Sequence, residues 1–165
     1  GEEVTTKTLP CDIVCELAHQ KAFEIAKAQK APCYVIGADT IVAFENRILG
    51  KPKDNADAVR MVSMLQGNTH QVYTGVTLIE VCADGSLREK SFYEETNVHV
   101  CQMTKDEIAS YVATGEPLDK AGAYGIQGTF SIYVSGIEGD YFNVVGLPVS
   151  RLYHEFAAFQ NAAHK

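Results

Sequence analysis

The chain has 165 residues, of which 46% are hydrophobic and 21% are charged, and its formal net charge is −7. This length supports one domain with a sizeable core, over residues 1–165, and the composition is typical of a globular protein. The negative charge argues against non-specific binding to nucleic acid polymers or anionic membranes, and no apolar run approaches the roughly 20 residues of a membrane span. The five cysteines form no CxxC pair, which favours a reducing cytoplasmic compartment over a disulfide framework or structural zinc site.

The first half of the chain predicts a helix, a strand and a second helix. Residues 12–30 carry an apolar stripe at helical spacing, with Asp12 as the expected N-cap. Residues 33–44 form an apolar run typical of a strand, which we expect to break near Asp39. Residues 55–66 have helical periodicity and end before a glycine.

The second half predicts a hairpin followed by helices and further strands. Residues 70–82 and 87–100 are strand-like and meet at an Asp-Gly turn. A capping box at 104–107 opens a helix that ends at Gly115.

The C-terminal region continues the alternation of strands and helices. We expect a strand over 130–137, a short extended segment over 141–147 and a final helix whose first turn contains Pro148. The alternation, with hairpins among the strands, predicts an α/β fold with a mixed central sheet flanked by helices.

Asp39 is the strongest candidate for a functional group. A carboxylate inside an apolar strand is costly unless it is paired, bound to metal or solvated in a cleft. Asp39 therefore has two interpretations that stay open. It is either a metal ligand or general base at a strand end, or a structural aspartate that caps local backbone amides.

Two lysines are further candidates. Lys51 lies in a Gly-Lys-Pro turn 12 residues after Asp39, where its ammonium could meet phosphate oxygens as a point charge. By itself such a lysine is more often a solvated loop residue. Lys21 lies on the apolar stripe of the first helix, so it either extends outward to water or points into a cleft.

Residues 119–128 (DKAGAYGIQG) form a loop that is rich in glycine and also contains a tyrosine and a glutamine. Its glycines allow close approach of backbone to a ligand, Tyr124 could stack on a ring, and Gln127 offers both donors and an acceptor for a base edge. The alternative is a tight structural turn. We interpret Asp140 and Asn143 as turn residues, and no histidine has the spacing of a metal ligand.

Taken together, these segments resemble the Maf family of nucleoside triphosphate pyrophosphatases, whose fold is like that of inosine triphosphate pyrophosphatase. The matching motifs are, in chain order, residues 18–22 (AHQKA), 36–42 (IGADTIV), 50–52 (GKP), 92–96 (FYEET), 115–128, which end in DKAGAYGIQG, and 139–148 (GDYFNVVGLP). The motif DKAGAYGIQG resembles the form found in the branch of the family that acts on dTTP and UTP.

The resemblance implies hydrolysis of dTTP or UTP, or of modified pyrimidine nucleotides, to the monophosphate and pyrophosphate. It implies two lobes around a cleft, a divalent metal (Mg²⁺ or Mn²⁺) and, in many members, a homodimer. By position Asp39 matches the catalytic acid and metal ligand. Lys21 and Lys51 match the lysines that meet phosphate, and Thr40 and Gln127 match positions linked to base selectivity.

One family segment has no counterpart in this sequence. The family opens with a strand followed by Ser-x-Ser-Pro-Arg-Arg, so we expect a domain without that strand and its phosphate-binding loop. A further family acid would fall near Glu2 and Glu3. The missing arginines keep open the alternative of a nucleotide-binding regulatory protein with impaired catalysis.

Overall fold

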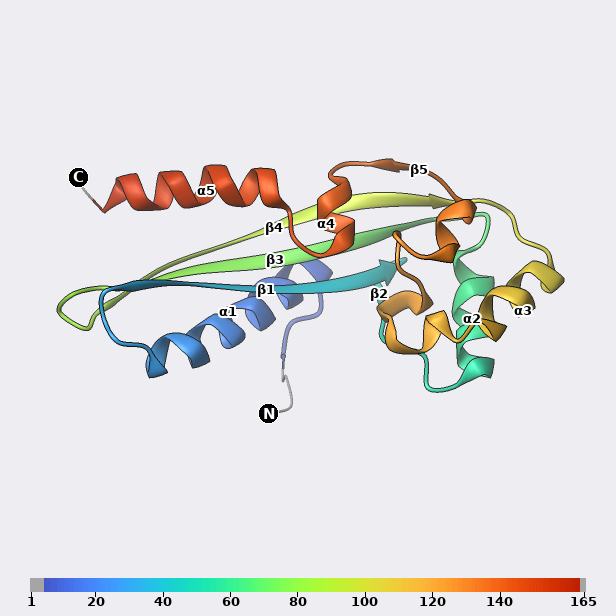
Figure 1. Ribbon diagram of the computed structural model, residues 1–165, viewed down its shortest axis with the longest axis horizontal. Helices are drawn as coiled ribbons and strands as arrows, with labels where there is room; N and C mark the ends of the chain where they lie inside the picture. Colours follow the sequence, from blue (N-terminus) through green and yellow to red (C-terminus); the bar gives the residue numbers. More distant parts are fainter. Residues whose placement is uncertain (1–4, 164–165) are drawn as a thin grey trace.

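The computed structural model describes residues 5–163, which form an α/β fold. One extended sheet runs the length of the molecule, with helices on both of its faces and a group of short helices at one end (Figure 1). The helices are α1 (Pro10–Ala28), α2 (Asn55–Leu65), α3 (Lys105–Ala113), α4 (Tyr141–Val145) and α5 (Val149–Ala162). The strands are β1 (Cys33–Phe44), β2 (Arg47–Leu49), β3 (Thr69–Val81), β4 (Leu87–Val100) and β5 (Val134–Glu138), and three 3-10 helices are η1 (Glu116–Asp119), η2 (Ala121–Ala123) and η3 (Thr129–Tyr133).

The sheet has five strands in the order β2-β1-β3-β4-β5. The α/β architecture with a central sheet flanked by helices is confirmed, but the sheet is not mixed: each pairing between the described strands is antiparallel. The connections explain this. Tight turns join β1 to β2 and β3 to β4, and the α2 segment returns the chain to the same end of the sheet, so that β3 runs back along β1.

Helix α1 lies directly on the backbone of one sheet face. A Cβ atom added at Gly75 of β3 would lie 2.2 Å from the carbonyl oxygen of Val14, and one added at Gly37 of β1 would lie 2.7 Å from that of Ala18. Glycine at these two positions therefore allows the helix to approach the sheet more closely than any other residue would. Helices α4 and α5 cover the opposite face (Figure 1).

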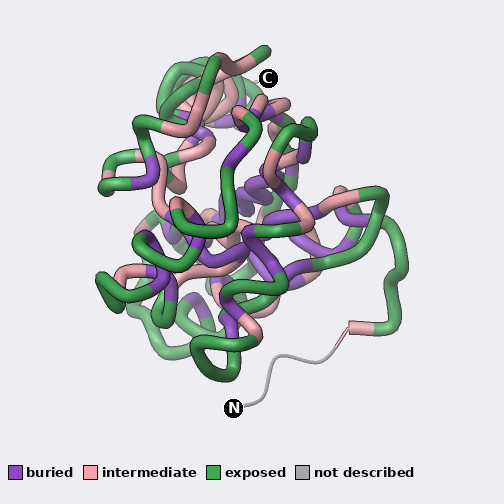
Figure 2. Tube along the Cα trace, turned by 90° about the vertical axis from the view of Figure 1, so that its right-hand side faces the viewer, coloured by how far each residue is buried: buried purple, intermediate pink, exposed green. Residues whose placement is uncertain are grey.

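A second lobe, made of α2, α3 and η1–η3, packs at the end of the sheet away from the β3–β4 turn (Figure 1). Its core joins Leu65 of α2, Tyr111 of α3 and Phe130 of η3 to Val72 of the sheet. Figure 2 shows buried residues gathered in the interior, with exposed segments around them. The expected two-lobe arrangement is thus present, and β1 and β3 run from one lobe into the other.

Several boundaries differ from the sequence-based expectations. Helix α1 starts at Pro10 with Leu9 as its N-cap, so Asp12 lies in the first turn and is not the cap. The strand expected over 130–137 begins only at Val134. The preceding residues form η3 because Phe130 is fully buried in the second lobe, which outweighs its strand propensity. Strand β1 is continuous through Asp39, without the expected break.

The segment expected to be extended over 141–147 is mostly helical. The side chain of Asp140 accepts a hydrogen bond from the backbone N–H of Phe142 and thereby caps α4. Gly146, at φ 139°, ends the helix in a conformation that favours glycine. The predicted capping box at Thr104 and Glu107 is confirmed, as are the β3–β4 hairpin and helix α2.

Candidate functional site

The structure brings Asp39 and Lys21 together. The Lys21 ammonium donates to the Asp39 carboxylate over 2.5 Å, and the Asp39 side chain is 11% exposed while that of Lys21 is 42% exposed. The close approach of α1 to Gly37 explains the meeting, since it places the lysine of the helix above the strand. Of the two interpretations of Lys21, the structure supports an inward-pointing side chain that keeps one side open to water.

Thr40, the next residue of β1, points to the other face of the sheet. Its hydroxyl lies 2.8 Å from the hydroxyl of Thr74, its cross-strand partner, and 3.3 Å from the carbonyl oxygen of Gly146 after α4. Asp39 pairs instead with Gly75, above which α1 lies. Successive residues of a strand face opposite sides, so the acid–lysine pair and Thr40 are neighbours in sequence on opposite faces of β1.

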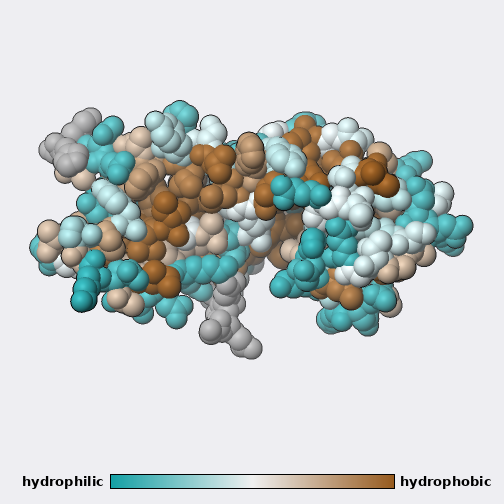
Figure 3. Space-filling model, in the orientation of Figure 1, coloured by the Kyte–Doolittle hydropathy of each residue, from teal (hydrophilic) through white to brown (hydrophobic). Residues whose placement is uncertain are grey.

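A cavity of about 330 Å³ opens on the Thr40 side. The sheet contributes Thr40, Val42 and Val72 to its wall, α4 contributes Val144 and Val145, and the rest comes from residues 120–121 and 124–128 of the Gly-rich loop. Figure 3 shows a hollow between the two halves of the molecule, where these elements meet. The cavity thus lies between the two lobes, and it gathers three predicted site residues: Thr40, Tyr124 and Gln127.

Hydrogen bonds and close packing fix the Gly-rich loop against the sheet. Gly122 has φ 71°, and a Cβ there would lie 2.8 Å from the side chain of Val42. Its N–H donates to the carbonyl oxygen of Gly50 over 3.1 Å. At the far end, the Glu116 carboxylate accepts from the backbone N–H of Thr129 over 3.1 Å. The loop is therefore a built wall of the cavity, with the exposed Gln127 at its rim.

Lys51 belongs neither to the Asp39–Lys21 pair nor to the lining of the cavity. Its side chain is exposed, and the hydrogen bond from Gly122 to Gly50 places the Gly-Lys-Pro turn beside the Gly-rich loop. Lys120 lowers the pKa of the exposed Asp119 carboxyl through a hydrogen bond, and Lys51 adds a smaller electrostatic effect on the same group. Lys51 is thus a cation next to the loop that does not line the cavity.

Sequence reasoning missed His70 and Lys120. His70 of β3 is fully buried, and its Nε2 lies 2.5 Å from the hydroxyl of Tyr124. Lys120 lines the cavity and pairs with Asp119 over 2.9 Å. The signal for His70 was its place on the apolar face of a strand, and Lys120 belongs to a loop already singled out.

Asn143 also differs from expectation, because it lies inside α4 and is fully buried. Its side-chain amide donates to the carbonyl oxygen of Val72 over 3.1 Å and to the hydroxyl of Thr96 over 3.0 Å. Asn143 therefore anchors α4, and with it one wall of the cavity, to β3 and β4 rather than shaping a turn.

Asp39 is the predicted metal ligand among the described residues. No group of three or more His, Cys, Asp or Glu side chains in that part of the chain could hold a metal ion. Asp39 supplies a single carboxylate, which fits Mg²⁺ held by one or two carboxylates, waters and substrate phosphates. Glu2 and Glu3 lie outside the described residues. Among residues 5–163, no helix has the length and apolar character needed to cross a bilayer.

Comparisons with known proteins find similar sequences over most of the chain. Residues 2–159 match the family model described as Maf-like protein. The chain is 53% identical to the dTTP/UTP pyrophosphatase of Agathobacter rectalis over 94% of this chain and 82% of that protein. It is 49% identical to the proteins of the same name from Lachnoclostridium phytofermentans (96% of this chain, 80% of that protein) and Bacillus cytotoxicus (98% and 82%).

Proposed function

The chain belongs to the Maf family, and we propose that it is a nucleoside triphosphate pyrophosphatase that hydrolyses dTTP and UTP to the monophosphate and pyrophosphate. The observation that carries the proposal is the juxtaposition at Asp39 and Thr40: a paired acid and lysine lie on one side of β1, and a largely apolar cavity lies on the other. The names of relatives that are 49–53% identical support the same activity.

The cavity is the site for the pyrimidine base. Its wall is largely apolar, with Val42, Val72 and the ring of Tyr124, while Gln127 offers an amide that can pair with the edge of uracil or thymine. A polar group that the bound base covers discriminates against a base that leaves it unpaired. The purines differ in both size and edge pattern, so the site favours pyrimidines.

Asp39 and Thr40 are consecutive residues of β1. A nucleotide whose base lies against Thr40 extends its phosphates toward Asp39 and Lys21. Lys51, beside the Gly-rich loop, is a further cation for the phosphate chain.

The reaction is attack of water on the α-phosphorus, with pyrophosphate as the leaving group. Asp39 orients the attacking water and accepts its proton, and Lys21 holds the carboxylate in place while its exposed side presents donors to phosphate oxygens. Mg²⁺ or Mn²⁺, held by Asp39 together with the substrate, neutralises the charge of the phosphates when it is bound.

The test is pyrophosphate release from a panel of dTTP, UTP, CTP, dATP and GTP in the presence of Mg²⁺ or Mn²⁺. We expect release from dTTP and UTP in preference to the purine nucleotides. Asp39→Asn keeps the shape of the side chain and removes its charge, so kcat should fall by about 10²- to 10⁴-fold, the usual contribution of a general base.

The matched control is Glu155→Gln, which removes the acid of a partly exposed ion pair with Lys90 (2.7 Å); Arg151 lies 3.6 Å from the same carboxylate. Pairs of this kind contribute roughly 0–1 kcal/mol to stability. Both variants should therefore melt within a few degrees of the wild type, but only Asp39→Asn should lose turnover. Full activity in Asp39→Asn would contradict the assignment. Nucleotide binding by the wild type without pyrophosphate release would favour the alternative of a catalytically impaired binding protein.

Four further expectations remain predictions. The dependence on a divalent cation is tested by chelation, and the homodimer by sedimentation. Fractionation of cells tests the cytoplasmic location. The expected lack of affinity for nucleic acid polymers, which follows from the net charge of −7, is tested by a gel-shift assay.

A further inference from the structure

We infer that His70 is a positioning residue for the nucleotide pocket and acts through the hydroxyl of Tyr124. The inference rests on the proposed function, because it takes the cavity as the base-binding site. His70 belongs to β3 and Tyr124 to the Gly-rich loop, 54 residues later in the chain. His70 does not itself line the cavity, so its effect on the substrate passes through Tyr124.

The contact between the two side chains is buried and specific. His70 has no exposed surface, and Tyr124 is 6% exposed. The imidazole Nε2 lies 2.5 Å from the Tyr124 hydroxyl, and the two rings meet edge to face with centroids 5.3 Å apart. A hydrogen bond in a low-dielectric interior is worth more than one in water and fixes both partners.

His70 is neutral in this contact. Burial, with a smaller effect of His99, lowers the pKa of His70 to about 4, so the imidazole carries one N–H near pH 7. Its Nδ1 is buried and has no hydrogen-bond partner among the described residues. The hydrogen bond between Nε2 and the Tyr124 hydroxyl is therefore the polar contact that holds this imidazole.

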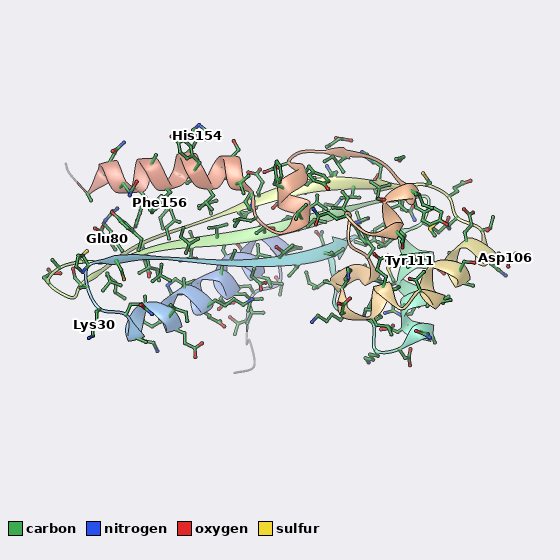
Figure 4. The ribbon with its side chains drawn as sticks, viewed as in Figure 1. Lys30, Glu80, Asp106, Tyr111, His154 and Phe156 are labelled. Carbon is green, nitrogen blue, oxygen red and sulfur yellow. The ribbon has the colours of Figure 1, made fainter. Side chains whose placement is uncertain are left out.

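Tyr124 is held from its other sides as well. Its ring packs on Phe130 with centroids 4.8 Å apart. The hydroxyl of Tyr111 donates over 2.8 Å to the carbonyl oxygen of Ala123, the residue before it. Figure 4 labels Tyr111 where α3 meets the 3-10 segments in the second lobe. His70, from strand β3, thus completes a set of contacts that fixes Tyr124 and, with it, one wall of the pocket.

Loss of the contact between His70 and Tyr124 should affect nucleotide binding and the chemical step differently. Tyr124 shapes the pocket on one face of the sheet, whereas Asp39 and Lys21 lie on the other face. Loss of the His70 hydrogen bond should therefore weaken the binding of the nucleotide and leave the chemical step nearly intact. Substitution of a residue that only supports the fold would instead lower nucleotide affinity, turnover and stability together.

The experiment measures kcat and KM for dTTP in His70→Phe, Tyr124→Phe and the double variant. Each single change removes the hydrogen bond and keeps a ring of similar shape. We expect KM to rise about tenfold in each single variant, the usual value of one net hydrogen bond, with kcat within about threefold of the wild type. The double variant should be no worse than either single variant, because both changes remove the same bond.

Two further variants complete the design. His70→Gln retains a side-chain amide, which can either donate to the Tyr124 hydroxyl or accept from it, and should recover much of the loss in KM. His154→Gln changes an exposed histidine on α5 whose Nδ1 lies 2.8 Å from the carbonyl oxygen of Ser150, and it should leave KM unchanged.

The inference is overturned if KM is unchanged in a folded His70→Phe variant, or if the effects of His70→Phe and Tyr124→Phe multiply. A fall in kcat that follows the loss of melting temperature would also contradict it. If the wild type releases no pyrophosphate, the proposed function fails by itself. Titration of dTMP by calorimetry then tests His70 separately, with an expected rise in Kd of about tenfold in His70→Phe.

Discussion

The buried histidine predicts a specific dependence of stability on pH. The pKa of His70 is lowered from 6.5 to about 4, first by burial and then by the charge of His99. The unfolded chain therefore binds a proton near pH 6.5, whereas the folded protein binds it only near pH 4. Because the unfolded state binds more protons between these values, the free energy of unfolding falls as the pH drops through this window.

The size of the effect follows from the same difference. A fall from 6.5 to about 4 corresponds to about 3 kcal/mol at 1.36 kcal/mol per pH unit. The loss begins near pH 6.5 and is complete near pH 4. For a protein of this size, about 3 kcal/mol lowers the melting temperature by about 6–12 °C.

Urea denaturation at pH 7 and pH 4.5 measures the effect in the wild type and in His70→Gln. Carboxylates also titrate in this range, but they are common to both proteins and cancel in the difference. We expect the wild type to lose about 2–3 kcal/mol more than His70→Gln between the two values, because glutamine does not take up a proton. Equal losses in the two proteins would contradict this prediction and would mean that His70 is not a buried neutral imidazole.

Two other predictions concern packing and metal. Gly75→Ala should lower the free energy of unfolding by about 3 kcal/mol or more, since the new Cβ would lie 2.2 Å from the backbone oxygen of Val14. The matched control is Gly50→Ala, where a Cβ meets nothing within 4 Å. This control should change the free energy of unfolding by less than about 0.5 kcal/mol. A wild-type-like melting curve for Gly75→Ala would show that α1 does not sit on β3 as described. Chelation of divalent cations should abolish pyrophosphate release without changing the melting temperature, because residues 5–163 contain no group of three or more side chains that could hold a metal before substrate binds. Activity that persists in excess chelator would exclude the metal from the mechanism.

Most of the local elements, and the resemblance to the family, can be recognised in the sequence alone. Periodicity, the capping box at Thr104 and the Asp-Gly turn between β3 and β4 predicted most helices and strands, because these signals depend on residues close together in the chain. It also singled out Asp39, since an acid in an apolar strand requires an explanation wherever the strand lies.

Only the three-dimensional structure shows which candidate residues lie in contact. Asp39 and Thr40 are adjacent in sequence, yet only the placement of α1 on one face and α4 on the other shows that they serve different sides of the sheet. The pairing of His70 with Tyr124 spans 54 residues, and no local pattern encodes it. Helix α4 was misjudged for a related reason: the burial of Asn143 against β3 and β4 stabilises a five-residue helix that its own propensity would not. Contacts between distant residues arise from packing in three dimensions, and in this protein they build the pocket.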